Sequence, residues 1–227
     1  MTRTRKLLAK TLLLTAAASL MVGATTREAS ACGGAWVPIV EEQIDWRVPG
    51  VLQAERLMDA GKSTDAAASV VRMMPHIKSL KMSASKPLVN RALRVLALSV
   101  ARTDGRLDAA RQLPAHVQDT WLGKSAEDRQ TNLTWATDIL RKTAEAQEND
   151  PQSRTELAEA LARTEGGEKE ALGILEELAK ADLVTSPEGY AALAHLRQKR
   201  GDRAGTKLAM ERCEAMAKDK STCAVHG

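Results

Sequence analysis

Aromatic residues are nearly absent from this sequence. Its 227 residues include no phenylalanine, one tyrosine and four tryptophans. Few large side chains are therefore available to fill an interior, and we expect Trp121 and Trp135 to lie in the core.

A net charge is also missing once the amino-terminal segment is set aside. The chain has 33 basic and 29 acidic residues, but its first 31 residues hold five of the basic and one of the acidic groups, which leaves 28 of each. A protein that neutralises nucleic-acid phosphates keeps an excess of Lys and Arg, so we expect no nucleic-acid partner. The composition, 44% hydrophobic and 27% charged, is that of a globular chain and excludes collagen and disorder.

Long apolar runs do not occur after residue 31, where no segment approaches the ~20 residues that span a membrane. The amino end has a basic stretch, an apolar run from Leu12 to Ala24 and the small residues Ala29-Ser30-Ala31. This layout predicts a signal peptide over residues 1–31, with Val22-Gly23-Ala24 as an alternative cleavage site. We expect an exported protein, periplasmic or extracellular, without a transmembrane segment after processing.

Cysteine is limited to three positions. Cys213 and Cys223 are expected to form a disulfide near the end of the chain, since a zinc site would need more ligands than the nearby His226. Cys32 follows a sequence that resembles a bacterial lipoprotein box. Its acylation would explain the odd number of cysteines and tether the protein to the cell envelope; the alternative is a free or intermolecular Cys32.

The residues that are abundant favour helices. The chain has 38 Ala and 27 Leu against 13 Val and 5 Ile. Capping signals mark helix starts at Ser125, Asp150-Pro151 and Ser186-Pro187, and we expect the longest helix over roughly 126–147. Glycines that could end a helix and begin a hairpin turn stand between apolar-periodic runs: Gly61, Gly105, Gly166-Gly167 and Gly201.

The glycines recur at intervals of 34 residues (Gly167 to Gly201) and 44 residues (Gly61 to Gly105), as in an α-solenoid. The chain resembles the tetratricopeptide repeat family. Three stretches carry the resemblance: Val51 to Pro75, Thr155 to Leu183 and Pro187 to Met216. In the last of them the family's aromatic, leucine, small-residue and turn positions are occupied by Tyr190, Leu193, Ala194 and Gly201.

The resemblance implies an all-α fold of antiparallel helical hairpins, stacked as a short solenoid, that holds a partner in a concave groove. The expected organisation is a signal peptide (1–31), a short extended or irregular cap (32–48), the helical repeats (49–217) and a tail (218–227). The pattern has departures: Arg197 replaces an aromatic residue, Pro114 interrupts a helix, and residues 75–87 do not fit the period. An irregular helical bundle is the alternative.

Motifs for chemistry are not found. Gly61-Lys62-Ser63 and Gly123-Lys124-Ser125 each lack the upstream glycine of a phosphate-binding loop. No metal-ligand spacing and no nucleophile motif occurs, and the histidines are scattered at His76, His116, His195 and His226. We expect no catalytic residue, no metal and no cofactor, and therefore no enzyme.

Charge is segregated along the chain. Residues 47–124 carry a net charge of +7 and residues 125–182 a net charge of −7. Arg91, Arg94 and Arg102 lie near one stripe of an apolar helix, where they could bind an anionic partner, form a solvated ridge or pair with the acidic half. Trp36 and Trp46 could cover the end of the first repeat or anchor a partner.

The sequence thus predicts an exported, non-catalytic binding or scaffold module for a protein or peptide. The partner-binding candidates are Arg91, Arg94, Arg102, Trp36 and Trp46. The alternatives are a structural subunit that self-associates through its opposite charges and a lipid-anchored envelope assembly factor.

Overall fold

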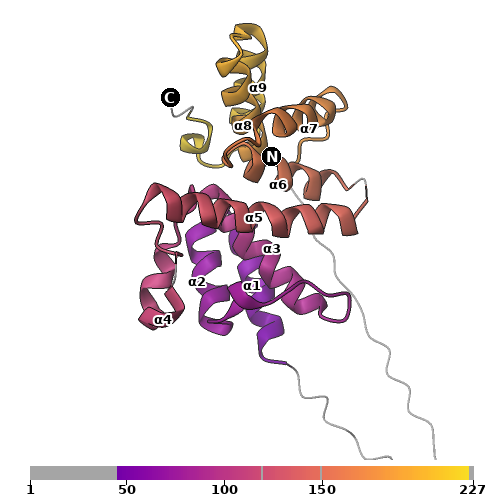
Figure 1. Cartoon of the computed structure of the whole chain (residues 1–227). Helices are drawn as coiled ribbons and strands as arrows, with labels where there is room; N and C mark the ends of the chain where they lie inside the picture. The colour runs from indigo at the N-terminus through magenta and orange to yellow at the C-terminus, as the bar shows by residue number, and fades with distance from the viewer. Residues whose placement is uncertain (1–44, 119, 149, 225–227) are drawn as a thin grey trace, which may run out of the picture. The chain divides into compact units, whose positions relative to one another are not determined.

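A computed structural model describes residues 45–118, 120–148 and 150–224 of the chain. These residues form helices and no strand, as the composition predicts (Figure 1). The predicted signal peptide, Cys32 and Trp36 lie outside the described residues. The helices, with three short 3-10 turns, are α1 (Arg47–Asp59), α2 (Ser63–Met73), η1 (Ile77–Ser79), α3 (Pro87–Arg102), η2 (Asp108–Gln112), α4 (Ala115–Gln118), α5 (Ala126–Ala146), α6 (Pro151–Leu161), α7 (Glu168–Lys180), α8 (Pro187–Lys199), α9 (Arg203–Met216) and η3 (Lys220–Cys223).

Helix ends follow the signals in the sequence. Ser125 and Asp128 form a capping box at the start of α5, and prolines occupy the first turn of α6 and α8 behind the caps Asp150 and Ser186. Four turn glycines adopt left-handed backbone angles, with φ between +74° and +77°: Gly61, Gly105, Gly166 and Gly201. Helix α1 begins at Arg47, two residues inside the segment that was expected to be irregular.

Three pairs of consecutive helices pack against each other: α1 with α2, α6 with α7, and α8 with α9. One expectation was wrong. Gly105 does not turn the chain directly into a second long helix, because η2, Pro114 and the four-residue α4 follow it. Helix α3 instead packs against α5, which begins 21 residues after Gly105.

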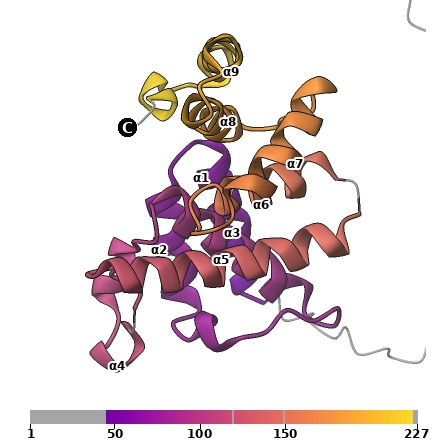
Figure 2. The same ribbon diagram turned by 45° about the horizontal axis from the view of Figure 1, so that its top comes forward.

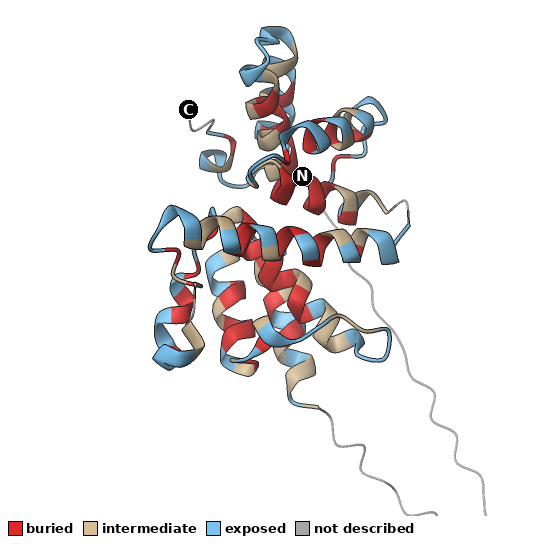
Figure 3. Cartoon of the chain, viewed as in Figure 1, coloured by how far each residue is buried: buried red, intermediate tan, exposed pale blue. Residues whose placement is uncertain are grey.

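The first helices of these pairs also contact one another in order, α1 with α3, α3 with α6, and α6 with α8 (Figure 2). Helix α3 is buried over most of its second half: from Ala92 to Ala101 every residue except Arg94 is buried (Figure 3). Trp121 is fully buried and meets the partly buried Trp135 edge to face, with ring centroids 5.0 Å apart. The expectation of a core role for Trp121 is confirmed.

Candidate binding groove

The three arginines of α3 all have carboxylate partners within the fold. Arg91 pairs with Glu55 of α1, and Arg94 pairs with Glu156 of α6. Arg102 pairs with Glu159 of α6 and Glu188 of α8. Two of the three arginines therefore pair with the acidic half of the chain, which is the arrangement expected under the pairing alternative. Partner binding by these arginines stays a prediction.

Arg102 is the centre of this cluster. Its Nε lies 2.9 Å from one oxygen of Glu159 and its Nη2 lies 3.3 Å from the other, while its Nη1 lies 3.2 Å from Glu188. Glu159 also accepts a hydrogen bond from the hydroxyl of Ser186, which caps α8. One guanidinium group thus links α3 to both α6 and α8, and its forked donors suit two carboxylates at once.

These charges are largely removed from water. The side chain of Arg102 is 12% exposed, and that of Glu159 is 3% exposed. Burial lowers the pKa of Arg102, but the charges of Glu159, Glu188 and Glu156 outweigh this effect and raise the pKa above its ordinary value. Burial raises the pKa of Glu156, and Arg94 offsets it only in part. Burial likewise raises the pKa of Glu188 against the opposing charge of Arg102.

Two cavities adjoin at this cluster. The first, of about 660 Å³, lies between α1, α3, α6 and the start of α8. The second, of about 770 Å³, is bounded by the α1–α2 turn, the end of α3 and α8. Both volumes are in the range of ligand-binding sites. We call the two cavities together the groove. The residues that line both are Gly61, Lys62, Arg102, Glu188 and Thr222.

The walls of the groove combine charged and apolar side chains. Five basic residues line it: Lys62, Arg94, Arg102, Arg163 and Lys218. Seven acidic residues also line it: Glu55, Asp59, Asp65, Asp104, Glu156, Glu188 and Asp219. The groove is therefore net acidic, although nearly half of its lining residues come from the half of the chain with a positive net charge. The apolar residues that line the first cavity include Met58, Val95 and Leu98, which are buried, and Met216, which is 43% exposed.

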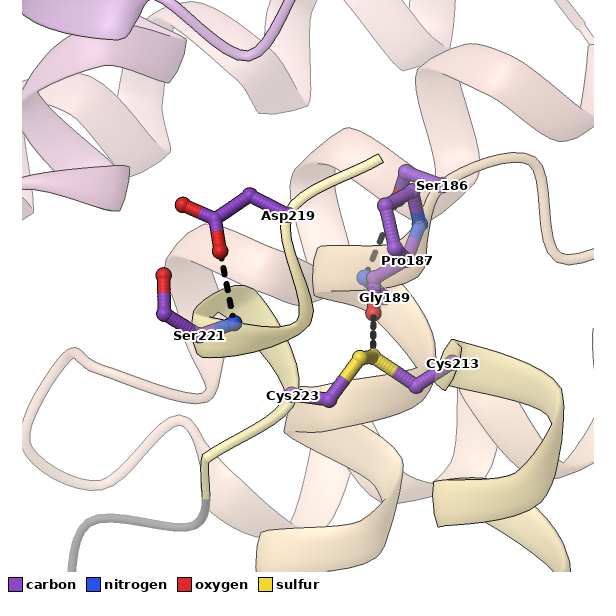
Figure 4. Close-up of a disulfide and its surroundings, with 7 residues drawn as sticks. All are labelled: Ser186, Pro187, Gly189, Cys213, Asp219, Ser221 and Cys223. Carbon is purple, nitrogen blue, oxygen red and sulfur yellow. Dashed lines mark hydrogen bonds between the residues drawn. A yellow bond between two sulfur atoms is a disulfide. The ribbon is translucent and has the colours of Figure 1, made fainter. Parts of the chain in front are cut away.

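The segment after α9 completes the groove. Lys218, Asp219 and Thr222 line the first cavity, and Ser221, Thr222 and Ala224 line the second. This segment folds back because Cys213 of α9 and Cys223 of η3 form the disulfide that the sequence predicts (Figure 4). Both cysteines are buried, and the Cys213 sulfur lies 3.1 Å from the carbonyl oxygen of Pro187 at the start of α8.

Reduction of the disulfide should lower the free energy of unfolding by about 2–3 kcal/mol, because the bond closes a short loop and restricts the unfolded chain. Urea unfolding of oxidised and reduced protein measures the difference, and circular dichroism should report unchanged helix content. The Cys213→Ser, Cys223→Ser double variant is the control: it should match the reduced protein and ignore reductant. Equal stability of oxidised and reduced protein would contradict the prediction.

The tryptophans and the cysteine that the sequence analysis singled out lie away from the groove or outside the described residues, whereas one histidine lines the groove. Trp46 is 65% exposed immediately before α1 and lines neither cavity. Trp36 and Cys32 lie outside the described residues. His195 lines the second cavity, where burial lowers its pKa. Within residues 45–118, 120–148 and 150–224, no group of three acidic, histidine or cysteine side chains is arranged to hold a metal ion, and no helix is both long and apolar enough to cross a membrane.

Three carboxylates of the cluster were missed by the sequence analysis. Glu156 and Glu159 stand three residues apart in α6, in which every residue from Thr155 to Leu161 is buried. Buried carboxylates are almost always paired, so both need cationic partners. The sequence did not reveal their burial, because six of the eleven residues of α6 are polar or charged. It did not reveal the role of Glu188 either, since the first turn of a helix is an ordinary place for a carboxylate.

The comparisons with known proteins place no constraint on the function of the groove. No family model matches the chain, and neither a curated protein nor a solved structure matches it. Its function must therefore be argued from its own residues.

Proposed function

We propose that this chain is an exported, non-catalytic helical-repeat protein that holds an extended segment of a protein or peptide in the groove. One observation carries the proposal: two adjoining cavities run along the first helices of successive pairs, α1, α3, α6 and α8. Solenoid proteins bind partners on a surface of this kind, which each repeat extends.

The repeats are proposed to be tetratricopeptide-like. The three packed hairpins coincide with the three stretches that resemble the family, and the left-handed glycines stand at its turn position. The pair α3 and α5 is an irregular unit whose second helix is delayed by η2 and α4. The contacts of α1 with α3, α3 with α6 and α6 with α8 support a stacked row of first helices.

The chemistry of the groove suits a polypeptide. Met216, which is 43% exposed and lines the first cavity, offers contact to apolar side chains, and the charged walls offer partners to polar ones. Arg94 and Arg102 are already engaged by carboxylates. They are therefore proposed to shape the groove, and a partner would contact those atoms of the ion pairs that face the cavities.

Export is part of the proposal. The buried Cys213–Cys223 disulfide supports an oxidising compartment, where such bonds persist. A lipid anchor at Cys32 is the alternative to a free periplasmic or secreted form, and the intact mass of the processed protein separates them.

Self-association driven by opposite charges is not favoured. Arg94 and Arg102 pair with Glu156 and Glu159 inside the fold, so the two halves of the sequence already satisfy part of each other's charge. These pairs supply no reason for a second copy to bind. A salt-dependent size in sedimentation would revive this alternative.

The proposed function is tested with a variant in which a large side chain blocks the groove. Ala191, on the face of α8 that lines the second cavity, is replaced by tryptophan, and the matched control is Ala204→Trp on the exposed start of α9. Each protein is incubated with a fully randomised library of short, terminally capped peptides, and retained peptides are sequenced. We expect the wild type and Ala204→Trp to retain the same peptides and Ala191→Trp to lose at least tenfold in affinity, about 1.4 kcal/mol. Retention of no peptide, or equal retention by both variants, would refute the proposal.

A further inference from the structure

The ion pair between Arg102 and Glu188 stands where the two cavities meet. Both residues line both cavities. An extended segment that occupied the whole groove would pass this pair. Its charge balance therefore bears on which partner the groove accepts.

Within the ion pairs of this cluster, carboxylates outnumber arginines; outside these pairs, Lys62 lines both cavities and Arg163 lines the second. Three carboxylates, of Glu156, Glu159 and Glu188, face the two guanidinium groups of Arg94 and Arg102. Glu156 and Glu159 each receive two nitrogens of one arginine, and Glu159 receives the hydroxyl of Ser186 as well.

Glu188 has the weakest compensation of the three. It meets one nitrogen of Arg102, at 3.2 Å, on a guanidinium group whose other two donors are directed at Glu159. Burial raises the pKa of Glu188, and the charges of Arg102 and Arg163 offset this only in part. A cation brought to the junction would supply that balance without displacing an existing ion pair.

We propose that the segment held in the groove carries a lysine or arginine side chain whose charge lies beside Glu188, at the junction of the two cavities. The net acidic walls favour the approach of such a segment. The aliphatic stem of the basic residue would lie along the apolar lining of the first cavity, where Met216 is exposed, while its charged end reaches the carboxylate. This inference rests on the proposed function, since it names the chemistry of the occupant of the same groove.

The first test reads charge preference from the randomised, capped peptide library, in which no terminal charge competes. Peptides retained by the oxidised wild-type protein should be enriched in Lys and Arg at one position and depleted in Asp and Glu there. The decisive peptides are those that the wild type retains and Ala191→Trp loses. If these peptides are enriched in acidic residues, or show no preference for either charge, this inference is overturned and the proposed function stands. Retention of no peptide would overturn both.

The second test determines whether the basic side chain of the peptide interacts with Glu188. The best retained peptide and its norleucine analogue, in which the basic residue has lost its charge, are titrated against the wild type, Glu188→Gln and the control Glu170→Gln. Glu170 is a carboxylate of α7 that pairs with Arg141 and lines neither cavity.

Glu188→Gln should weaken the basic peptide roughly tenfold, while Glu170→Gln should leave its affinity unchanged. The norleucine analogue should bind the wild type and Glu188→Gln equally, because its interaction with Glu188 is already lost. The norleucine substitution is made on the peptide, so its effect cannot arise from misfolding. Equal loss of both peptides on Glu188→Gln, or no loss of either, would overturn the assignment of the cation to Glu188.

Discussion

Replacing Arg102 with methionine should lower the free energy of unfolding by roughly 3–5 kcal/mol, because removing one partner of a buried ion pair leaves an uncompensated charge. Here two carboxylates lose their cation, since Arg102 pairs with both Glu159 and Glu188. Methionine fills much of the same space, so the loss reports charge more than packing. Urea unfolding at pH 7 measures the effect.

A matched control separates burial from ion pairing in general. Arg141 and Glu170 also pair through two nitrogens, but their side chains are 38% and 46% exposed. Arg141→Met should therefore cost less than about 1 kcal/mol. Adding Glu159→Gln and Glu188→Gln to Arg102→Met should restore most of the stability, since no buried charge is then left alone. A loss equal to that of Arg141→Met, or no recovery in the triple variant, would contradict the account.

The loss in free energy of unfolding caused by Arg102→Met should be smaller at mildly acidic pH than at pH 7. Without the guanidinium group, Arg102 no longer opposes the effect of burial on Glu188, so the pKa of Glu188 in the folded state rises further above its value in the unfolded chain. The folded state then binds protons that the unfolded state has released, so stability falls as pH rises through this window and recovers as pH falls. Urea unfolding of the wild type and Arg102→Met at pH 7 and at mildly acidic pH measures the difference in stability. A difference that is unchanged or larger in acid would contradict the prediction.

Local features of the fold could be predicted from the sequence because local chemistry determines them. The capping box at Ser125 and the caps before Pro151 and Pro187 mark helix starts through contacts within one turn. The disulfide was predictable too, because Cys213 and Cys223 are the two cysteines close enough in sequence to close a small loop. Such signals need no knowledge of distant residues.

The groove depends on contacts that sequence patterns do not encode. Arg94 and Glu156 are 62 residues apart, and Arg102 and Glu159 are 57 apart. The sequence indicated which arginines share a stripe of α3, but not which helix covers that stripe. The positive net charge of residues 47–124 likewise did not predict the sign of the groove, because the residues of this half that line the cavities, with three cations and four carboxylates, are already net acidic.

Gly105 fixes how closely the turn after α3 approaches α5. A Cβ at this position would lie 2.8 Å from the Cα and 2.9 Å from the carbonyl carbon of Arg129 on α5, and the backbone is left-handed, with φ of +74°. Moving the turn away would strain the hydrogen bond that the amide of Asn132 donates, at 2.8 Å, to the carbonyl of Gly105. Backbone angle and close approach therefore both require glycine here.

Gly105→Ala and Gly61→Ala together distinguish these two requirements. Gly61 has nearly the same backbone angle, φ of +75°, but a Cβ there would meet no atom within 4 Å. Gly61→Ala should therefore cost only the left-handed conformation, roughly 1–2 kcal/mol, whereas Gly105→Ala should cost a further ~1–3 kcal/mol for overpacking against the α5 backbone. Urea unfolding of the two variants gives the difference directly. Equal losses would mean that the turn can withdraw from α5 freely, and the packing of α3 on α5 would then have to be maintained by the buried side chains of α3 alone.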